Sequence, residues 1–600
     1  MNSIFILEFK EDINYLKKKL LSDKNIIVIS TNSNISYHLT QNKISFVKLN
    51  SFWNQKFDYL SHLKKTLRIP KIIEANFFSI FENFSKYNWN IIDDFLYPIK
   101  ITYDQLFYYT FCLNKILLKY SISKVYISHN KKIMFSDEYI FSQNQSIIYH
   151  LLKSKKKLRI ISIKKKYNKY NKNVDNFSFG QVKKKNTFTS EKTLLKTKLS
   201  QRNHNIISLS SPEVQVLYNQ FVNYKKNIIN LNYSANTACE TITNKRTNNF
   251  VNKLKTNKTL LKFLLMNNFD VSKLFLSQIF HLSLLFEDIF DKFLSYFNII
   301  SKMNTKLIIF TTMAPFDNQN IIFKKICNLK DIPKVVWCHG GYCNLHLDGF
   351  DITDFKECVN HFSYGQYLKK ITNEKNFLPR KIFKLDYKCY NIGSPYINVN
   401  FKPQSKKKIN EKKIIFIRGE MYQHNQSYFP SYGSIKSEEK PILIEEVLNI
   451  LKGYQYDYEI IFKDYPNPSD FGLWREYLFN MGFNKIKYIS NKKSLNEVLE
   501  NNQLVILPWL SSTFFHSLPY KNKIFMYDRS LYQKAFSTCN DEIRYFRNKN
   551  IFLKSLKLFL KKMDKTTFSL NKKAIKCFLN GNRPDNFRKS FDLAVKNITK

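Results

Sequence analysis

Short apolar runs alternate with amphipathic stretches along the first part of the chain. Residues 25–30, 44–49, 124–128 and 158–163 are rich in β-branched and aromatic side chains, which predicts strands. The stretches between these runs carry apolar residues at helical spacing. Alternation of strands and helices favours a parallel sheet. We therefore expect an N-terminal α/β region over residues 1–163.

The pattern changes after this region. Residues 164–205 are dominated by Lys, Asn and Ser and carry few periodic apolar positions, which predicts a basic flexible insertion. A basic arm that grips phosphates is the alternative. Residues 206–300 return to helical periodicity and are expected to form a helical region. Charged residues interrupt its most apolar part, residues 262–300, so this part predicts a buried helical pair and not a membrane span.

Strand patterns are clearest after residue 305. The predicted strands here are residues 307–311, 335–338, 361–364 and 390–392. The last three lead into turns that begin with or contain Gly340, Gly365 and Gly393. In open α/β sheets, ligands bind at the carboxyl ends of the strands, so these turns indicate a functional edge. We expect residues 301–403 to be the remainder of an N-terminal Rossmann-like domain.

A second alternating unit follows a Lys-rich linker at residues 404–408. Its predicted strands are residues 414–417, 458–462, 485–489, 504–507 and 524–527, with helices between them. We expect residues 412–535 to form a C-terminal Rossmann-like domain. Residues 536–600 are basic and helical in pattern and are expected to form a C-terminal tail.

The net charge of the chain is +49, from 96 Lys and Arg against 47 Asp and Glu. Such an excess suggests a nucleic-acid or anionic-membrane partner. The chain is also rich in Phe, Tyr, Ile and Asn and has only 12 Gly and 15 Pro. Because an AT-rich genome produces this composition, codon bias explains most of the charge. Eleven of the 12 glycines lie at or after residue 340, which places the special backbone geometry in the second half.

Nine cysteines without a regular framework indicate a reducing compartment. Acidic residues within the first dozen positions argue against a signal peptide. We therefore expect a cytoplasmic protein, with peripheral attachment of its basic faces to the inner face of the plasma membrane as an open alternative.

Ser511, Ser512 and Thr513 lie where a predicted strand gives way to a helix. The free N–H groups and positive dipole of a helix start form an anion site, and hydroxyl side chains add donors. Plain helix capping without a ligand is the alternative. Arg418 and Gly419 follow one predicted strand of the same unit and Lys463 ends another. These loops could converge on a diphosphate.

His339, Gly340 and Gly341 form the other candidate site. Two consecutive glycines in a chain poor in glycine imply a tight turn or a close approach of the backbone to another group. A structural role for the histidine is the alternative. A zinc site would draw on Cys338, His339, Cys343, His346, Cys358 and His361. Their spacings do not match structural zinc patterns, so we expect no metal.

These segments resemble a known group of transferases. The sequences CHGGYC, HFSYG and IGSPYIN, followed by a basic strand end and a Ser-Ser-Thr loop, resemble GT-B-fold transferases of bacterial capsule and lipopolysaccharide biosynthesis. A more distant resemblance is to the CDP-glycerol polyglycerophosphotransferases. The resemblance as a whole covers about residues 305–535. The resemblance implies an α/β fold with two Rossmann-like domains facing a cleft, a helical insertion and a helical tail.

The resemblance also implies roles for individual residues. His339, Gly340 and Gly341 would lie at the cleft, and Ser511, Ser512 and Thr513 would hold the donor phosphates. The segment from Lys463 to Pro466 resembles the Lys-x-His-Pro strand end of the group, with Tyr465 in place of the histidine. The acidic residue that often follows the Ser-Ser loop is replaced by Phe515 and His516.

The function implied is metal-independent transfer of a sugar from a nucleotide-activated donor to a cell-surface polysaccharide or glycolipid acceptor, without a cofactor. His339 would be the general base or a donor to the leaving phosphate, while Arg418, Lys463 and the Ser511–Ser512–Thr513 loop offset its charge. A CDP-alcohol-dependent polyol-phosphate transferase on the same fold is one alternative. A basic nucleic-acid-binding protein is another, although the Lys-rich tracts contain no recognisable nucleic-acid motif and no nucleic acid is expected as a partner.

Overall fold

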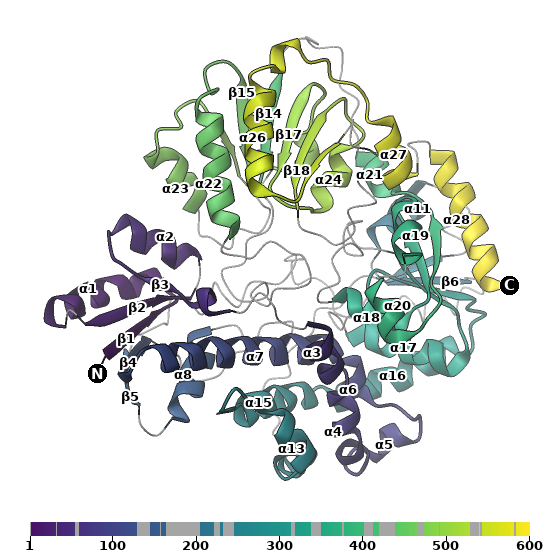
Figure 1. Ribbon diagram of the computed structural model, residues 1–600. Helices are drawn as coiled ribbons and strands as arrows, with labels where there is room; N and C mark the ends of the chain where they lie inside the picture. The colour runs from purple at the N-terminus through teal and green to yellow at the C-terminus, as the bar shows by residue number, and fades with distance from the viewer. Residues whose placement is uncertain are drawn as a thin grey trace.

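A computed structural model of the chain describes three parallel sheets with their helices (Figure 1). The described residues are 2–23, 25–31, 33–53, 59–128, 144–155, 158–163, 205–209, 211–220, 228–231, 245–313, 318–337, 350–374, 377–400, 412–418, 439–464, 473–490, 493–528, 539, 543–580 and 584–600.

The first sheet is formed by the N-terminal region and has the strand order β3-β2-β1-β4-β5. Its strands are β1 (Asn2–Leu7), β2 (Ile26–Ser30), β3 (Val47–Lys48), β4 (Ile122–Ser128) and β5 (Arg159–Ile163). Successive side chains of β1 point to opposite faces, and both faces are buried because helices cover them. The helices of this region are α1 (Ile13–Ser22), α2 (Ser33–Gln41), α3 (Tyr59–Thr66), α4 (Ile69–Phe78), α5 (Glu82–Ser85), α6 (Ile91–Asp94), α7 (Leu96–Lys119) and α8 (Asn144–Lys153).

The second sheet has the order β13-β12-β11-β10-β6-β7. Its strands are β6 (Ile206–Leu209), β7 (Ile228–Leu231), β10 (Leu307–Phe310), β11 (Lys334–Trp337), β12 (Asn360–Ser363) and β13 (Lys388–Asn391). The helices around it are α11 (Pro212–Gln220), α13 (Lys245–Lys255), α14 (Lys258–Phe263), α15 (Ser272–Ser283), α16 (Phe286–Ile300), α17 (Asn318–Lys330), α18 (Phe350–Glu357), α19 (Tyr367–Thr372), α20 (Leu378–Phe383) and α21 (Pro395–Asn400). A short antiparallel pair, β8 (Leu265–Met266) and β9 (Phe269–Asp270), precedes α15.

The second sheet differs from the sequence prediction in two ways. The prediction joins residues 301–403 to residues 1–163 in one domain, whereas the structure places the two regions in separate sheets. The prediction also makes residues 206–300 helical, whereas β6 and β7 lie within them and pair with each other and with β10. Each of these strands has only four residues, and a short apolar run does not reveal its period.

The third sheet has the order β16-β15-β14-β17-β18-β19. Its strands are β14 (Lys413–Ile417), β15 (Glu459–Lys463), β16 (Lys487–Ile489), β17 (Gln503–Leu507), β18 (Lys523–Tyr527) and β19 (Ile543–Phe546). The helices that follow these strands are α22 (Glu439–Lys452), α23 (Leu473–Asn480), α24 (Ser512–Ser517) and α26 (Lys549–Leu560). The unit therefore extends beyond the predicted limit at residue 535. The predicted α/β class with two Rossmann-like units is confirmed by the second and third sheets, and the first sheet is a further unit.

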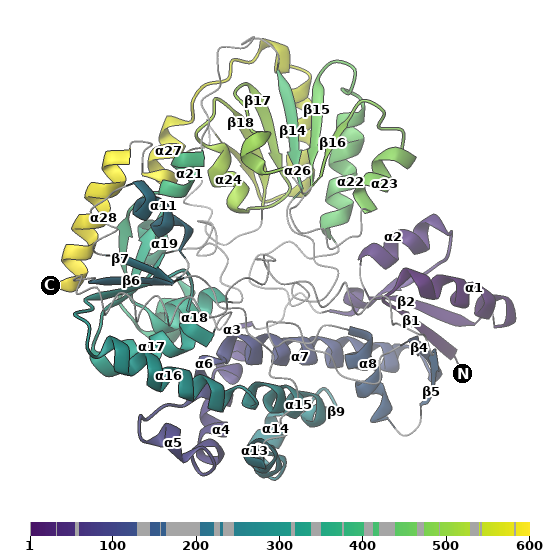
Figure 2. The same cartoon turned by 180° about the vertical axis from the view of Figure 1, so that it is seen from behind.

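The C-terminal helices connect the third unit back to the second. After α26 packs on the third sheet, α27 (Lys572–Leu579) and α28 (Pro584–Thr599) lie beside the second sheet (Figures 1 and 2). The rings of Trp337 on β11 and Phe591 on α28 stack with centroids 5.9 Å apart. The predicted helical tail is thus part of two cores.

Two scarce glycines permit this return. A Cβ on Gly365, just after β12, would lie 2.1 Å from the backbone oxygen of Cys577 in α27. Gly393, just after β13, has a φ of +95°, and a Cβ there would lie 2.3 Å from the ring of Phe587 in α28. The scarcity of glycine predicts that these two positions have no room for a side chain. In the structure, α27 and α28 fill that room.

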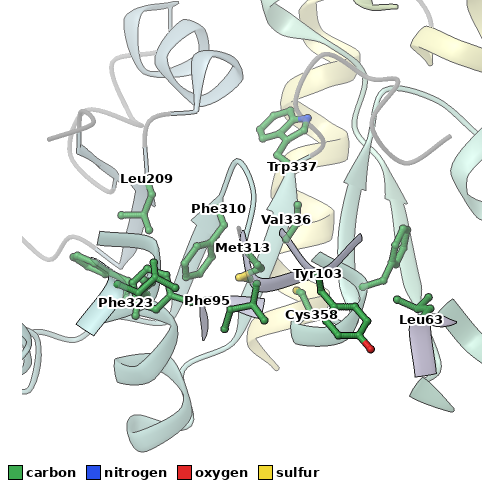
Figure 3. Close-up of a cluster of buried hydrophobic side chains, with 14 of the residues drawn as sticks. Leu63, Phe95, Tyr103, Leu209, Phe310, Met313, Phe323, Val336, Trp337 and Cys358 are labelled. Carbon is green, nitrogen blue, oxygen red and sulfur yellow. The ribbon is translucent and has the colours of Figure 1, made fainter. Parts of the chain in front are cut away.

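The three units touch one another in pairs. The rings of Tyr37 on α2 and Tyr477 on α23 join the first and third units, with centroids 6.0 Å apart. Between the first and second units, Lys324 Nζ on α17 lies 2.5 Å from Asp94 Oδ1 on α6. Around that ion pair, buried side chains from both units form a continuous core, which includes Phe95 and Phe323 (Figure 3). In the part of the chain that the structure describes, no helix is long and apolar enough to cross a bilayer.

Candidate functional site

The third sheet has the strand order in which an open α/β sheet binds ligands at a switch point. In sequence order within the unit, its strands are arranged 3-2-1-4-5-6. β14 and β17, the first and fourth strands, are neighbours at the centre of the sheet. The strand that follows β14 lies on one flank of this pair, and the strand that follows β17 lies on the other. Ligands bind outside the carboxyl ends of such a strand pair. Phe416 of β14 is in register with Ile506 of β17, so Arg418 and Pro508 follow these two strands at the same edge.

A buried charged cluster lies at this edge. Arg418 Nε lies 2.7 Å from Asp464 Oδ1, and the Tyr488 hydroxyl donates to Oδ2 of the same carboxylate. Lys463 Nζ donates to the backbone oxygens of Asp464 at 2.7 Å and Ser490 at 3.2 Å. Burial lowers the pKa of Lys463. Two cationic side chains thus lie at the switch point, with Asp464 inside the cluster and Glu497 close enough to act on Lys463.

This arrangement changes the role open to Arg418 and Lys463. Both residues are predicted to contact the donor, but their side chains are almost fully buried, with Arg418 ion-paired to Asp464 and Lys463 hydrogen-bonded to backbone oxygens. In this structure they can act on a bound anion through their charge and by fixing the strand ends. Asp464 belongs to the sequence motif but is not among the predicted site residues, and its carboxylate holds Arg418 in place.

Ser511, Ser512 and Thr513 begin α24, directly after β17. Ser511 has an extended backbone at the cap position, and its side chain makes no capping hydrogen bond. Its backbone oxygen accepts from the amide of Phe514 at 3.0 Å. All three hydroxyl residues are partly exposed, in contrast to Phe514 and Phe515, which are buried. Ser511 therefore caps α24 through its backbone oxygen and not through its side chain.

Helix α24 is also the contact between the second and third units. The ring of Phe515 lies edge-on to Tyr364 with centroids 5.5 Å apart, and it lies 5.8 Å from Tyr367. The ring of His516 lies 6.0 Å from Tyr396 at the start of α21. These three aromatic partners belong to the carboxyl edge of the second sheet. The structure thus brings that edge to the helix that carries the Ser-Ser-Thr sequence.

The His-Gly-Gly segment and Gly419 lie outside the described residues, so the placement of His339, Gly340 and Gly341 stays a prediction. The described chain ends before this segment at Trp337 in β11 and resumes at Phe350 in α18. Asp354 of α18 accepts from the Thr312 hydroxyl at 2.8 Å and from the Met313 amide at 2.5 Å, both just after β10. Burial raises the pKa of Asp354 to about 7.

Two members of the Cys and His group have structural roles. Cys358 Sγ donates to the backbone oxygens of Lys334 and Asn360. His361 is fully buried between Phe355 and Tyr387, and its Nε2 lies 2.9 Å from the oxygen of Cys358. Burial lowers the pKa of His361 to about 4, so its ring is neutral near pH 7. Cys358 and His361 both belong to the core of the second unit.

The basic insertion predicted at residues 164–205 lies almost wholly outside the described residues.

Glu213 is a residue of this region that the sequence did not reveal. It lies in the first turn of α11, directly after β6, and its carboxylate accepts from the Ser394 hydroxyl and the Tyr396 amide, each at 2.8 Å. The Tyr364 hydroxyl also hydrogen-bonds to it. Burial raises the pKa of Glu213 to about 7 despite these donors. In the sequence Ser-Pro-Glu, a glutamate looks like an ordinary first-turn residue that favours the helix dipole.

Comparison with known proteins gives weak structural likenesses. No protein-family model and no curated protein matches the chain. UDP-GlcNAc 2-epimerase of Methanocaldococcus jannaschii, solved with UDP-GlcNAc and UDP, is 12% identical with a TM-score of 0.37, over 65% of this chain and 98% of that one. UGT71G1 of Medicago truncatula, complexed with UDP-glucose, is 11% identical with a TM-score of 0.34, over 66% and 99%. A ugt transferase from Siraitia grosvenorii, in complex with UDP, is 10% identical with a TM-score of 0.33, over 68% and 97%. Likenesses this weak show similarity and nothing more.

Proposed function

We propose that this protein is a glycosyltransferase of the GT-B type that uses a nucleotide-activated sugar. The observation that carries the proposal is the edge of the third sheet. A switch point, two buried cationic side chains and the hydroxyl-bearing start of α24 lie there together. Positive charge and N–H donors at a fixed place are what a departing nucleoside diphosphate requires.

The acceptor side of the proposed reaction is the carboxyl edge of the second sheet. This edge meets α24 through Tyr364, Tyr367 and Tyr396, so a donor at α24 would have its sugar directed toward the second unit. We propose His339 as the base that removes the proton from the acceptor hydroxyl, or as a hydrogen-bond donor to the leaving phosphate. The acceptor is proposed to be a cell-surface polysaccharide or a lipid-linked saccharide at the inner face of the plasma membrane.

A nucleotide panel tests the donor part of this proposal. The melting temperature of the wild-type protein would be measured with UDP, GDP, CMP and CDP compounds, because a ligand of the native state raises it. We expect one nucleoside diphosphate sugar to stabilise the protein and Ser512→Ala to weaken that ligand by about 1–3 kcal/mol, the cost of a lost hydrogen bond to a charged group. Thr566→Ala is the control, since the Thr566 hydroxyl bonds to the Lys562 oxygen near the opposite edge of the sheet, where Lys412 before β14 bonds to the Met563 oxygen. Stabilisation by CDP-alcohols alone would favour the polyol-phosphate transferase, and no response to any nucleotide would contradict both.

A further inference from the structure

We propose that Glu213 is the positioning residue that sets the place of α24 against the second sheet. Its carboxylate ties three segments together: the start of α11, the end of β12 through Tyr364, and the turn before α21 through Ser394 and Tyr396. The consequence for α24 follows from the structure alone, whereas the consequence for donor binding rests on the function proposed above.

The contacts of Glu213 account for the order of the turn after β13. Ser394 donates to one carboxylate oxygen of Glu213, and the same Ser394 oxygen accepts from the amide of Ile397 at 3.1 Å. The amide of Tyr396 donates to the other carboxylate oxygen. The first turn of α21 is therefore held by a side chain from a different helix, more than 180 residues earlier in the sequence.

Two of the groups that Glu213 holds are those that meet α24. Tyr364 presents its hydroxyl to Glu213 and the edge of its ring to Phe515. Tyr396 presents its amide to Glu213, and its ring lies 6.0 Å from the ring of His516. Each tyrosine thus joins the buried carboxylate on one side to α24 on the other. Burial lowers the pKa of His516 to about 4, so this face of α24 is uncharged near pH 7.

Burial explains why one carboxylate can have this effect. Glu213 is 2% exposed, and an unmet buried polar group is costly, so its three donors have little freedom to move away. A side chain that orders several segments at once acts as a common anchor. Residues 512–517 would keep their place only while Tyr364 and Tyr396 keep theirs.

Hydrogen exchange of the α24 amides tests the inference with a matched pair of variants. Tyr364→Phe removes only the hydroxyl that reaches Glu213 and keeps the ring that packs on Phe515. Tyr387→Phe is the control, because its hydroxyl bonds to the Phe355 oxygen at 3.0 Å in the same unit, and Tyr387 packs on Phe355, His361 and Phe377, away from α24. We expect Tyr364→Phe and Glu213→Gln to speed exchange of residues 512–517 by roughly 10- to 100-fold, and Tyr387→Phe to leave it unchanged.

The outcomes separate this inference from the proposed function. Unchanged exchange in α24 of a folded Tyr364→Phe protein would overturn the inference, whatever the nucleotide results. Should Glu213→Gln fail to fold, Tyr364→Phe and Ser394→Ala still decide it, because both leave the carboxylate in place. A titration with the nucleotide that stabilises the wild type completes the test. If the variants exchange α24 faster and bind the nucleotide more weakly than the wild type, both proposals are supported. If the variants exchange α24 faster but the wild type binds no nucleotide, only the inference is supported.

Discussion

The Arg418 guanidinium and the Asp464 carboxylate form a buried ion pair, with Nε 2.7 Å from Oδ1 and neither side chain exposed by more than 2%. They follow the neighbouring strands β14 and β15, and the amide of Arg418 donates to the oxygen of Lys463 between them. The ends of β14 and β15 are therefore joined at the switch point by one backbone hydrogen bond and one side-chain ion pair.

Removing the charge of Asp464 should strongly destabilise the third unit. Asp464→Asn leaves Arg418 buried without its counter-charge, which typically costs about 3–5 kcal/mol. Thermal unfolding measures the loss. Glu459→Gln on the same strand β15 breaks a more exposed pair with Lys413, and should change stability by no more than about 1 kcal/mol. Equal melting temperatures for the two variants would contradict the assigned importance of the Arg418–Asp464 pair.

Adding a methyl group at Gly365 should detach α27 from the second sheet. The new Cβ would lie 2.1 Å from the Cys577 oxygen, and backbone atoms there must shift. Overpacking of this kind costs about 1–3 kcal/mol. Gly453→Ala is the control, because the nearest atom to its Cβ lies at 3.6 Å. Limited proteolysis should cleave the C-terminal helices of Gly365→Ala faster than those of Gly453→Ala, and indistinguishable cleavage would show that α27 can adapt.

Glu213 should make the stability of the second unit depend on pH. Its pKa is raised by burial from 4.5 to about 7, so the folded protein binds this proton more tightly than the unfolded chain. The contribution of Glu213 to stability therefore falls as the pH rises from 4.5 to about 7, by about 3 kcal/mol, and is constant above. Glu213→Gln cannot titrate, so the stability of the wild type relative to this variant should decline across that window. Melting curves of both proteins at pH 5 and pH 8 measure the decline, and a difference that does not vary with pH would contradict it.

Replacement of His339 should affect the chemical step and leave donor binding intact. His339→Ala is expected to lower turnover by roughly 10²- to 10⁴-fold, the range for a lost acid–base group. Affinity for the nucleotide should change little, because the phosphates are proposed to bind at α24. Turnover and nucleotide affinity measured on the same preparation check both parts. A loss of nucleotide affinity equal to the loss of turnover would show that His339 binds the donor and does not act in the chemical step.

The strands of the third sheet could be predicted from the sequence because their signals are local. β14, β17 and β18 are apolar runs bounded by polar or turn residues, and each lies within one residue of its predicted position. The charged and hydroxyl residues at their ends can be identified for the same reason. Strand order fixes the switch point, and the alternation of strands and helices was sufficient to place these residues at one edge.

Other features depend on contacts between distant segments, which a single sequence does not display. β6 and β7 are four residues long, and only their pairing beside β10 makes them strands. The partners of Glu213 lie more than 150 residues away in the sequence, at Tyr364, Ser394 and Tyr396. The sequence indicates that Gly365 and Gly393 are sterically required, but the groups that require them are in α27 and α28. In each case the chemistry of the residue was visible and its partner was not.

The central claim is that the switch point of the third sheet binds the nucleotide, and a hydrogen-exchange footprint tests it most directly. The first sheet also has the order 3-2-1-4-5 and a switch point of its own, between β1 and β4, which makes it a rival site within the same chain. Exchange would be followed with and without the nucleotide that gives the largest thermal stabilisation. We predict that protection appears in residues 414–418 and 508–517, at the ends of β14 and β17. Protection confined to residues 5–9 and 126–128, at the ends of β1 and β4, would contradict the account.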